Sequence, residues 1–554
     1  MKLYKNWMWM IVLFGVALLP LINLASSGLP ITHDGQDHVA RIANFYASLT
    51  EGILIPRWAA KLNWGYGHPI LMFLYPFPSY VASLFHLIGF SFVDSTKLVF
   101  AVGFIASFFA MYLWAASSWG RAAGVLAAVL YTFAPYRFID LYVRGAIGEH
   151  VAFIFPPLIC YGLFRLSRQT KVTASTWIWI SVSCALLILS HNALSLMFLP
   201  LIALYALYLA IYETKHKVRF IAVTAVSICW GFVLSAFFWV PALMEGKYTL
   251  RDIVTRGDVM ERFVPWISFL DSGWNYGGGN EFSKYVGTAQ LLGLIVVLWK
   301  IRKVTHSQKI FIAGVMLALV VSLYLMTNGA SGIWQVVTLL QKFQFPWRLL
   351  SVVVFLFSIV GAFGAYIVPA HMRRWVVGLL CGVAILSTSS MWQAKQYKVF
   401  SESYFTSVYR GTTDTGESSP IWSIRFMEHE PKEVMSVISG NVSVVQVSRS
   451  IDTHVYNIVV DSSEARLVEN TLYFPGWNVF VDGKSVDLQF QDPEFRGLMT
   501  FMVPKGKHAI SVEFGDTNLR KFANIVSVVG IVVFIVFLGT MRVWQSKKLQ
   551  FRSR

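Results

Sequence analysis

Apolar runs long enough to cross a membrane recur along almost the whole chain. An α-helix needs roughly 20 mostly apolar residues to span the hydrocarbon core, and inside that core only helices and closed barrels satisfy their own backbone. Charged residues make up 14% of the 554 residues, against about a quarter in soluble domains. Thirteen segments qualify as spans: 8–26, 70–90, 98–117, 122–135, 151–165, 176–190, 194–212, 220–241, 286–300, 310–327, 349–369, 375–392 and 522–541. The sequence predicts a mainly α, polytopic membrane helix bundle of about 12–14 spans.

The positive charge of the chain is confined to short clusters between these runs. The net charge is +17, and the pattern follows the excess of Lys and Arg in cytoplasmic loops. The clusters are Arg165, Arg168 and Lys171; Lys215, Lys217 and Arg219; Lys300, Arg302 and Lys303; Arg373 and Arg374; and Arg542, Lys547, Lys548, Arg552 and Arg554. Membrane orientation therefore accounts for the charge, and we expect the lipid bilayer, with no nucleic acid, as a partner. The predicted location is the plasma membrane, with both termini cytoplasmic.

Two cytoplasmic termini require an even number of spans. We expect 98–117 and 122–135, which only four residues separate, to form one span plus a buried or re-entrant piece. That arrangement gives twelve spans. The segments facing outward are then 27–69, 136–150, 242–285, 328–348 and 393–521.

Near its C-terminus the chain changes from continuous apolar runs to alternation. Apolar and polar residues alternate through 442–448 and 454–460, as in strands with one solvated face. Turn dipeptides such as Pro475-Gly476 and Asp482-Gly483 separate the runs. We predict an extracytoplasmic β-sandwich at 395–520, preceded by a transmembrane domain at 1–394. A final helix with a basic cytoplasmic tail follows at 521–554.

The first outward segment holds the densest group of ionisable residues. It reads Thr32-His33-Asp34-Gly35-Gln36-Asp37-His38. In a helix starting near Asp34, this residue would share one face with Asp37 and His38. Such a group would suit a general base or a divalent cation, Mg or Mn, held by Asp34 and Asp37. The alternative is structural: Asp34 caps an interfacial helix and the histidines are solvated.

Other candidate residues lie just before or between apolar runs. Arg144 and Glu149 precede a span and either meet charged ligands or pair with each other or with lipid headgroups. His191 interrupts a long uncharged stretch and is a candidate ligand contact or a packing residue. Arg348 opens a span and either binds a phosphate or reaches to the interface. A Gly-Lys-Ser/Thr phosphate loop is missing from the sequence, which disfavours ATP-driven transport.

Several short motifs occur in an order that makes their joint match specific. They are His33-Asp34 with His38 and Arg41, Pro56-Arg57-Trp58, Gly65-Tyr66-Gly67-His68-Pro69, Tyr142-Val143-Arg144-Gly145 with Glu149, Ser190-His191-Asn192, Phe345-Pro346-Trp347-Arg348 and Tyr473-Phe474-Pro475-Gly476-Trp477. With these motifs the chain resembles a bacterial multi-pass membrane family labelled "6-pyruvoyl-tetrahydropterin synthase-related". The soluble enzyme of that name binds zinc through three histidines on a compact α/β scaffold. This sequence supplies no such scaffold, so we interpret the label as inherited.

The architecture is also similar to the GT-C superfamily of membrane glycosyltransferases. That resemblance implies transfer of a sugar from a polyprenyl-phosphate carrier to a glycan or cell-wall polymer acceptor, with inversion at the anomeric carbon. It implies Asp34 and Glu149 as catalytic carboxylates, although a clear Asp-Asp or Asp-Glu pair is missing. The residues expected to bind the phosphate or the substrate are His33, His38, Arg57, Arg144, His191 and Arg348.

Two other classes of function remain open from the sequence. A flippase or exporter of lipid-linked glycans would use the same charged residues along a passage reachable from both sides of the membrane. A non-catalytic envelope assembly protein would bind through its outer domain, and its acidic and basic residues would not meet in one place. The observation that best distinguishes these classes is therefore where Asp34, Arg144, Glu149 and Arg348 lie relative to one another.

Overall fold

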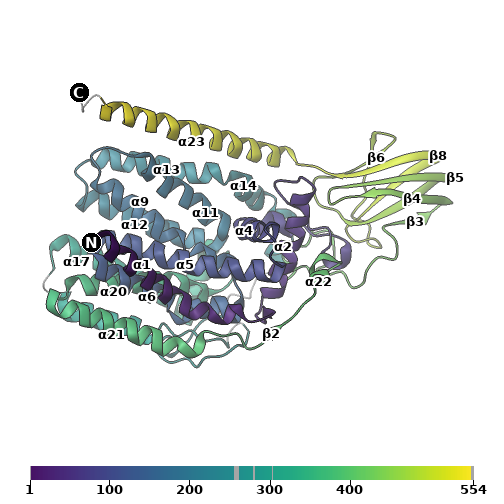
Figure 1. The fold of residues 1–554 in the computed structure, drawn as a ribbon. Helices are drawn as coiled ribbons and strands as arrows, with labels where there is room; N and C mark the ends of the chain where they lie inside the picture. The colour runs from purple at the N-terminus through teal and green to yellow at the C-terminus, as the bar shows by residue number, and fades with distance from the viewer. Residues whose placement is uncertain (1, 255–260, 279–280, 302–303, 551–554) are drawn as a thin grey trace.

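A long helical bundle carries a β domain at one end (Figure 1). The computed structural model describes residues 2–254, 261–278, 281–301 and 304–550. Of the residues named above, Arg302, Lys303, Arg552 and Arg554 lie outside these ranges. The main helices of the bundle are α1 (Lys2–Leu18), α5 (Phe92–Trp119), α6 (Arg121–Thr132), α9 (Phe155–Arg168), α11 (Ser183–Ser190), α12 (Asn192–Tyr212), α13 (Lys217–Leu234), α16 (Thr288–Lys300), α17 (His306–Leu325), α20 (Leu350–Ile367), α21 (Ala370–Thr388) and α23 (Asn518–Gln550).

The described ranges contain nine helices that are long and apolar enough to cross a membrane. One bent pair, Arg121–Thr132 with Pro135–Arg144, and two shorter apolar helices, Ala174–Ser190 and Thr288–Lys300, bring the apolar segments to twelve. The segment Pro346–Ile367, which contains α20, is 89% buried and is the central helix, whereas α23 lies at the edge with 22% of its window buried. The predicted polytopic bundle is thus confirmed.

The structure departs from the expected spans at 70–90. This segment is broken into α3 (Ile70–Phe73) and α4 (Phe77–Leu87), neither of which reaches spanning length. The break follows from Pro76 and Pro78, because proline cannot continue a helical hydrogen-bond ladder from the preceding turn. Residues 98–117 lie in the span Phe92–Trp119, whereas 122–135 belong to the bent pair, a broken span or a re-entrant loop, so the expected span plus re-entrant piece stays a prediction.

Helix α1 begins and helix α23 ends at the end of the bundle opposite to the β domain (Figure 1). An even number of crossings returns a chain to its starting end, and the twelve apolar segments fit that parity. By this alternation, the loops after α9 and α12 lie at the same end as the start of α1, and α16 ends there. These loops carry the basic clusters, which is consistent with the predicted orientation; the cytoplasmic side of the termini stays a prediction.

The C-terminal domain is an antiparallel sheet of six strands. The strands are β3 (Met435–Ser439), β4 (Val442–Arg449), β5 (Thr453–Leu472), β6 (Trp477–Val481), β7 (Lys484–Val486) and β8 (Leu498–Phe514). Their order is β3-β5-β8-β6-β7, and β4 also pairs with β5. The predicted β domain is therefore present, but hydrogen bonds join its strands into one sheet rather than the two sheets of a sandwich. The 20-residue β5 and 17-residue β8 pair along most of their lengths and connect all the shorter strands.

Residues between α21 and β3 lie across the bundle instead of joining the sheet. A two-residue strand, β2 (Tyr397–Lys398), pairs with β1 (Leu29–Pro30) of the first outward segment. Further on, the backbone carbonyl of Thr413 accepts a hydrogen bond from Arg41 at 2.7 Å. This strap, 396–425, holds the first outward segment in place at the β-domain end.

Buried ionic and aromatic contacts fix the sheet to the bundle. Arg520, which is 0% exposed, pairs with Glu245 at 2.8 Å and donates to the carbonyl of Pro475 at 2.6 Å. Trp58 and Trp477 meet edge to face with their centroids 5.4 Å apart. A fully buried charge retains its place only when it is paired, so these contacts define one orientation of the domain.

Candidate functional site

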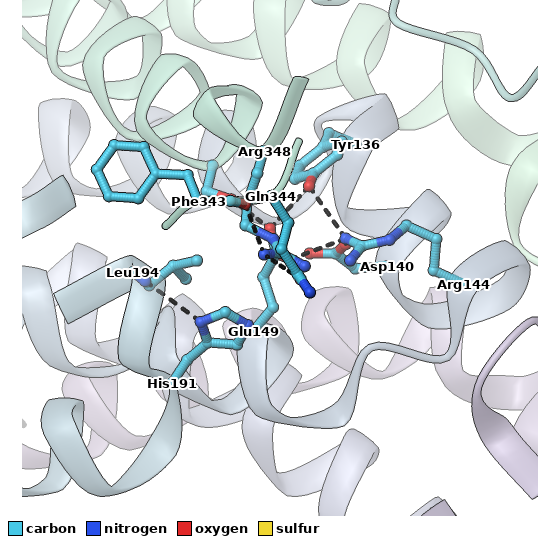
Figure 2. Close-up of polar contacts among 10 residues, drawn as sticks. Tyr136, Asp140, Arg144, Glu149, His191, Leu194, Phe343, Gln344 and Arg348 are labelled. Carbon is cyan, nitrogen blue, oxygen red and sulfur yellow. Dashed lines mark hydrogen bonds and ion pairs between the residues drawn. The ribbon is translucent and has the colours of Figure 1, made fainter. Parts of the chain in front are cut away.

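The carboxylate of Glu149 is the centre of a buried polar cluster (Figure 2). Glu149 is 0% exposed. Its Oε2 accepts from Arg144 at 2.8 Å, while its Oε1 accepts from the hydroxyls of Tyr136, at 2.7 Å, and Ser351. Arg144 also donates to Asp140 at 2.6 Å. Each of these side chains therefore has an ionic or hydrogen-bond partner, as low-polarity surroundings require, although Oδ2 of Asp140 has no hydrogen-bond partner among the described residues.

A second arginine reaches the same carboxylate from a distant part of the chain. The Nε of Arg348 lies 3.6 Å from Oε2 of Glu149, and its Nη1 donates to the carbonyl of Phe343 at 2.8 Å. Arg348 stands just before α20, where a 3-10 turn, Pro346–Leu349, starts the span. The ring centroid of Trp347 lies 4.6 Å from the guanidinium carbon of Arg144. Two guanidiniums thus share one buried acid.

An irregular helix brings Arg144 back toward Glu149. Residues Ile139–Arg144 form a π-helix, and the helix pair that contains it is bent by 49°. Such π-helical turns occur frequently at functional sites. Gly145 then adopts a left-handed conformation with φ of 68°, and α8 (Ile147–Ala152) begins at once. This reversal places side chains five residues apart in direct contact.

Asp34 lies against the same turn through its backbone. The amides of His33 and Asp34 donate to the carbonyls of Val143, at 3.0 Å, and Arg144, at 2.8 Å. The half-buried Asp34 stands at the N-cap position of α2 (Gly35–Thr50), but its side chain makes no capping bond. The amide of Gly35 instead donates to the hydroxyl of Thr32.

The Asp34 carboxylate is therefore available at the edge of the cluster. Among the residues that the structure describes, none forms a hydrogen bond or ion pair with this carboxylate. It is close enough to Arg144 to interact with that guanidinium electrostatically. The capping alternative, in which the Asp34 side chain accepts a hydrogen bond from the first turn of α2, is therefore wrong.

Replacement of Gly145 by Ala is expected to separate the two segments. A Cβ there would lie 2.2 Å from the hydroxyl oxygen of Thr32, in addition to the cost of about 1 to 2 kcal/mol for a left-handed non-glycine residue. Gly52→Ala is a matched control, since Gly52 has φ of 86° and nothing within 4 Å of its Cβ position. Thermal unfolding should show a clearly larger loss for Gly145→Ala; equal losses would contradict the close packing.

Histidines surround the cluster on the side of α2 and α12. The ring of His191 stacks on Tyr75 with centroids 5.0 Å apart, and its Nδ1 accepts from the amide of Leu194. His38 and Arg41 line a cavity of about 20 Å³ with Tyr75. Burial, reinforced by the charges of Arg41 and Arg144, lowers the pKa of His38 well below its ordinary value. His38 is therefore a neutral imidazole at neutral pH.

Some predicted site residues lie elsewhere or at the rim. Arg57 is not part of the cluster: its guanidinium pairs with Asp516 at 3.2 Å beside the β domain. The exposed His33 contacts the carbonyl of Tyr276 at 3.2 Å, which brings the loop after 270 to the rim.

The predicted metal site finds few ligands. Asp37 accepts from the hydroxyl of Tyr409 at 2.7 Å, and burial raises the pKa of Asp37. Within the described ranges no group of three or more His, Cys, Asp or Glu side chains is arranged to hold a metal. Asp34 and Asp37 remain the two candidate ligands, the metal ion stays a prediction, and we derive no step through it.

Sequence reasoning assigned no role to Asp140, Tyr136, Ser351 or Lys284. Asp140 precedes Arg144 by four residues, a helical ion-pair spacing that was there to be found. Ser351 has no such local signal, because its partner Glu149 belongs to a remote segment. Tyr136 bonds to Glu149 and Arg144, but its spacing to them is not one of the helical pair spacings. Lys284 is 4% exposed, and its ammonium lies 6.0 Å from the ring centroid of Trp347.

Lys284 gives a prediction for the pH dependence of stability. Burial lowers its pKa to about 7, whereas an unfolded lysine keeps its proton up to about pH 10.4. Between these values the unfolded state binds more protons, so stability rises with pH by at most about 1.4 kcal/mol per unit. The difference in unfolding free energy between wild type and Lys284→Met should therefore shift in favour of wild type from pH 7 to pH 9; a constant difference would contradict it.

The chain matches a described protein family over more than half of its length. The family described as "6-pyruvoyl-tetrahydropterin synthase related domain; membrane protein" matches residues 71–394. An uncharacterized protein of Lactococcus lactis subsp. cremoris (strain MG1363) is 25% identical over 305 residues, which cover 53% of this chain and 49% of that protein. The chain thus spans about half the length of this relative.

Two glycosyltransferase structures are similar at low sequence identity. For the arabinofuranosyltransferase AftD from Mycobacteria, the TM-score is 0.43 and the identity 16%, over 69% of this chain and 28% of AftD. For ArnT from Cupriavidus metallidurans bound to undecaprenyl phosphate, the TM-score is 0.35 and the identity 13%, over 72% of this chain and 68% of ArnT.

Proposed function

The chain belongs to the 6-pyruvoyl-tetrahydropterin synthase related family of membrane proteins, and we propose that it acts as a membrane glycosyltransferase. It would transfer a sugar from a polyprenyl-phosphate carrier to a glycan or cell-wall polymer acceptor outside the cytoplasm. One observation carries this proposal: the carboxylate of Asp34, which bonds to none of the described residues, lies beside Arg144, and a buried glutamate holds Arg144 together with Arg348. A transporter passage does not need such a pairing of a free base with fixed cations.

Arg144 and Arg348 are the groups that would receive the phosphate of the carrier. A guanidinium has five N–H donors, and the bonds to Glu149, Asp140, Phe343 and neighbouring oxygens leave some of them for a ligand. Fixed donors aimed at a developing negative charge stabilise a transition state without reorganisation. The arginines would therefore stabilise the phosphate as it leaves the sugar.

Asp34 would act as the general base in a single displacement. The acceptor hydroxyl oxygen forms a bond to the anomeric carbon while the bond from this carbon to the phosphate oxygen breaks. The electron pair of the broken bond stays on the phosphate, and the hydroxyl proton passes to the Asp34 carboxylate. The displacement inverts the anomeric configuration.

We assign Glu149 to positioning rather than to contact with substrate. Its full burial and its four partners favour this role over that of a second catalytic acid. Without it, the two guanidiniums would repel each other and lose their common orientation.

The proposed function can be tested with the full chain in inverted and right-side-out membrane vesicles. A panel of synthetic polyprenyl-phosphate sugars is added, and the release of polyprenyl phosphate is followed together with sugar incorporation into envelope polymers. We expect transfer from at least one donor, in right-side-out vesicles only. Movement of intact donor across the membrane without cleavage would contradict the proposal and favour the flippase.

A further inference from the structure

A second cavity lies where the β domain meets the bundle, apart from the cluster around Glu149. Its volume is about 390 Å³. One wall is the stretch that follows α2, 52–58; the other consists of Ile451 and Asp452 with the end of β8 and the start of α23. We call it the junction cavity. Helix α2 separates it from Asp34, and the 14 residues from Asp34 to Ser48, which lines the cavity, correspond to roughly 21 Å of helix.

The junction cavity opens at the boundary between the lipid-facing helices and the β domain. Asn524, one of its lining residues, lies within the first two turns of the last span, Asn518–Arg542. On the same helix Phe522 and Ile525 are 63% and 61% exposed, and Leu54 of the opposite wall is 75% exposed. Apolar side chains on both sides of the opening are typical of contact with lipid.

The residues that line the cavity carry more negative than positive charge. Arg57 is its one cation among the described lining residues, and it is neutralised by Asp516 at 3.2 Å and held by Asn524 at 2.8 Å. Asp452 has no cationic partner: the hydroxyls of Ser450 and Thr453 both donate to its Oδ1. Within the described part of the chain, no hydrogen bond reaches Oδ2 of Asp452. The cavity therefore presents one uncompensated carboxylate next to lipid.

We propose that the junction cavity binds the headgroup of a membrane lipid that carries a primary ammonium group, with Asp452 as its counter-ion. An ammonium has three N–H donors and no acceptor, which matches a carboxylate with an open oxygen. The acyl chains would lie along the exposed apolar side chains of α23 and Leu54. An anionic headgroup is disfavoured, since Arg57 is already paired and Asp452 would repel it. This inference does not depend on the proposed transferase activity.

The test uses the purified full chain, titrated with phosphatidylethanolamine, phosphatidylcholine or phosphatidylglycerol and examined by native mass spectrometry. We expect phosphatidylethanolamine to bind most tightly, because a quaternary ammonium lacks N–H donors and the glycerol headgroup lacks the cation. Asp452→Asn keeps the oxygen that accepts from Ser450 and Thr453 but removes the charge. It should weaken phosphatidylethanolamine binding about tenfold, as expected for a charge-assisted hydrogen bond.

Two further variants keep the test decisive. Asp487→Asn removes an exposed carboxylate of the same domain and should leave binding unchanged. Gly515→Leu adds a side chain where nothing lies within 4 Å of the Cβ position, and it should block the cavity without opposing packed atoms. Equal binding of the three lipids, preference for phosphatidylglycerol, or full binding by both Asp452→Asn and Gly515→Leu would overturn the proposal.

Discussion

Asp34→Asn should abolish most sugar transfer while leaving the fold intact. Positioned general bases contribute about 10² to 10⁴ in rate, so we expect transfer to fall at least about a hundredfold. The asparagine has nearly the same shape but cannot take the proton of the acceptor hydroxyl. The side chain of Asp34 makes no capping bond, and its segment is held through backbone amides that the substitution preserves. The measurement is the initial rate of polyprenyl phosphate release by membranes that contain equal amounts of each variant.

Asp37→Asn is the matched control for this experiment. It lies three residues further along α2, and an asparagine oxygen still accepts from the hydroxyl of Tyr409. We expect transfer to fall only slightly, with an unchanged unfolding temperature for both variants. Full activity of Asp34→Asn would remove this residue from the mechanism. Equal and large losses in both variants would instead favour a metal held by the two carboxylates.

Glu149→Ala should destabilise the bundle more than any other single change at the site. Removal of one partner from a buried ion pair leaves an uncompensated charge and typically costs about 3 to 5 kcal/mol. Here two guanidiniums would lose their shared acid, and the hydroxyls of Tyr136 and Ser351 would lose their acceptor. We therefore expect a large fall in the thermal unfolding midpoint in detergent, together with loss of transfer.

Glu464→Ala is the control variant, because it removes the same carboxylate from an exposed position on β5. It should unfold within experimental error of the wild type. The contrast between Asp34 and Glu149 separates the two proposed roles: Asp34→Asn should lose rate at constant stability, while Glu149→Ala should lose both. A Glu149→Ala protein as stable as the wild type would show that the buried cluster does not hold the site together.

Of the residues singled out in the sequence, Arg144, Glu149 and Arg348 meet in one cluster and Asp34 adjoins it, while their roles stay predictions. The motifs around Asp34, Arg144, Glu149 and Arg348 indicated the family, and the family match confirms that resemblance. The alternative that Arg144 and Glu149 pair with each other is also confirmed, because their side chains form an ion pair. Arg57 belonged to the same motifs but lies at the β-domain junction, because its partners Asp516 and Asn524 are almost at the other end of the chain.

By itself, the sequence determined that the chain is a membrane helix bundle followed by a β domain, since hydropathy and alternation are local properties and depend on the solvent that each residue meets. It also determined which residues carry charge into an apolar environment. Only the tertiary structure decided that 70–90 is broken, that the strands form one sheet, and that Glu149 is enclosed by two arginines while Asp34 is left open. Those outcomes depend on contacts between residues hundreds of positions apart, and the free energy of a buried charge is set by its neighbours in space.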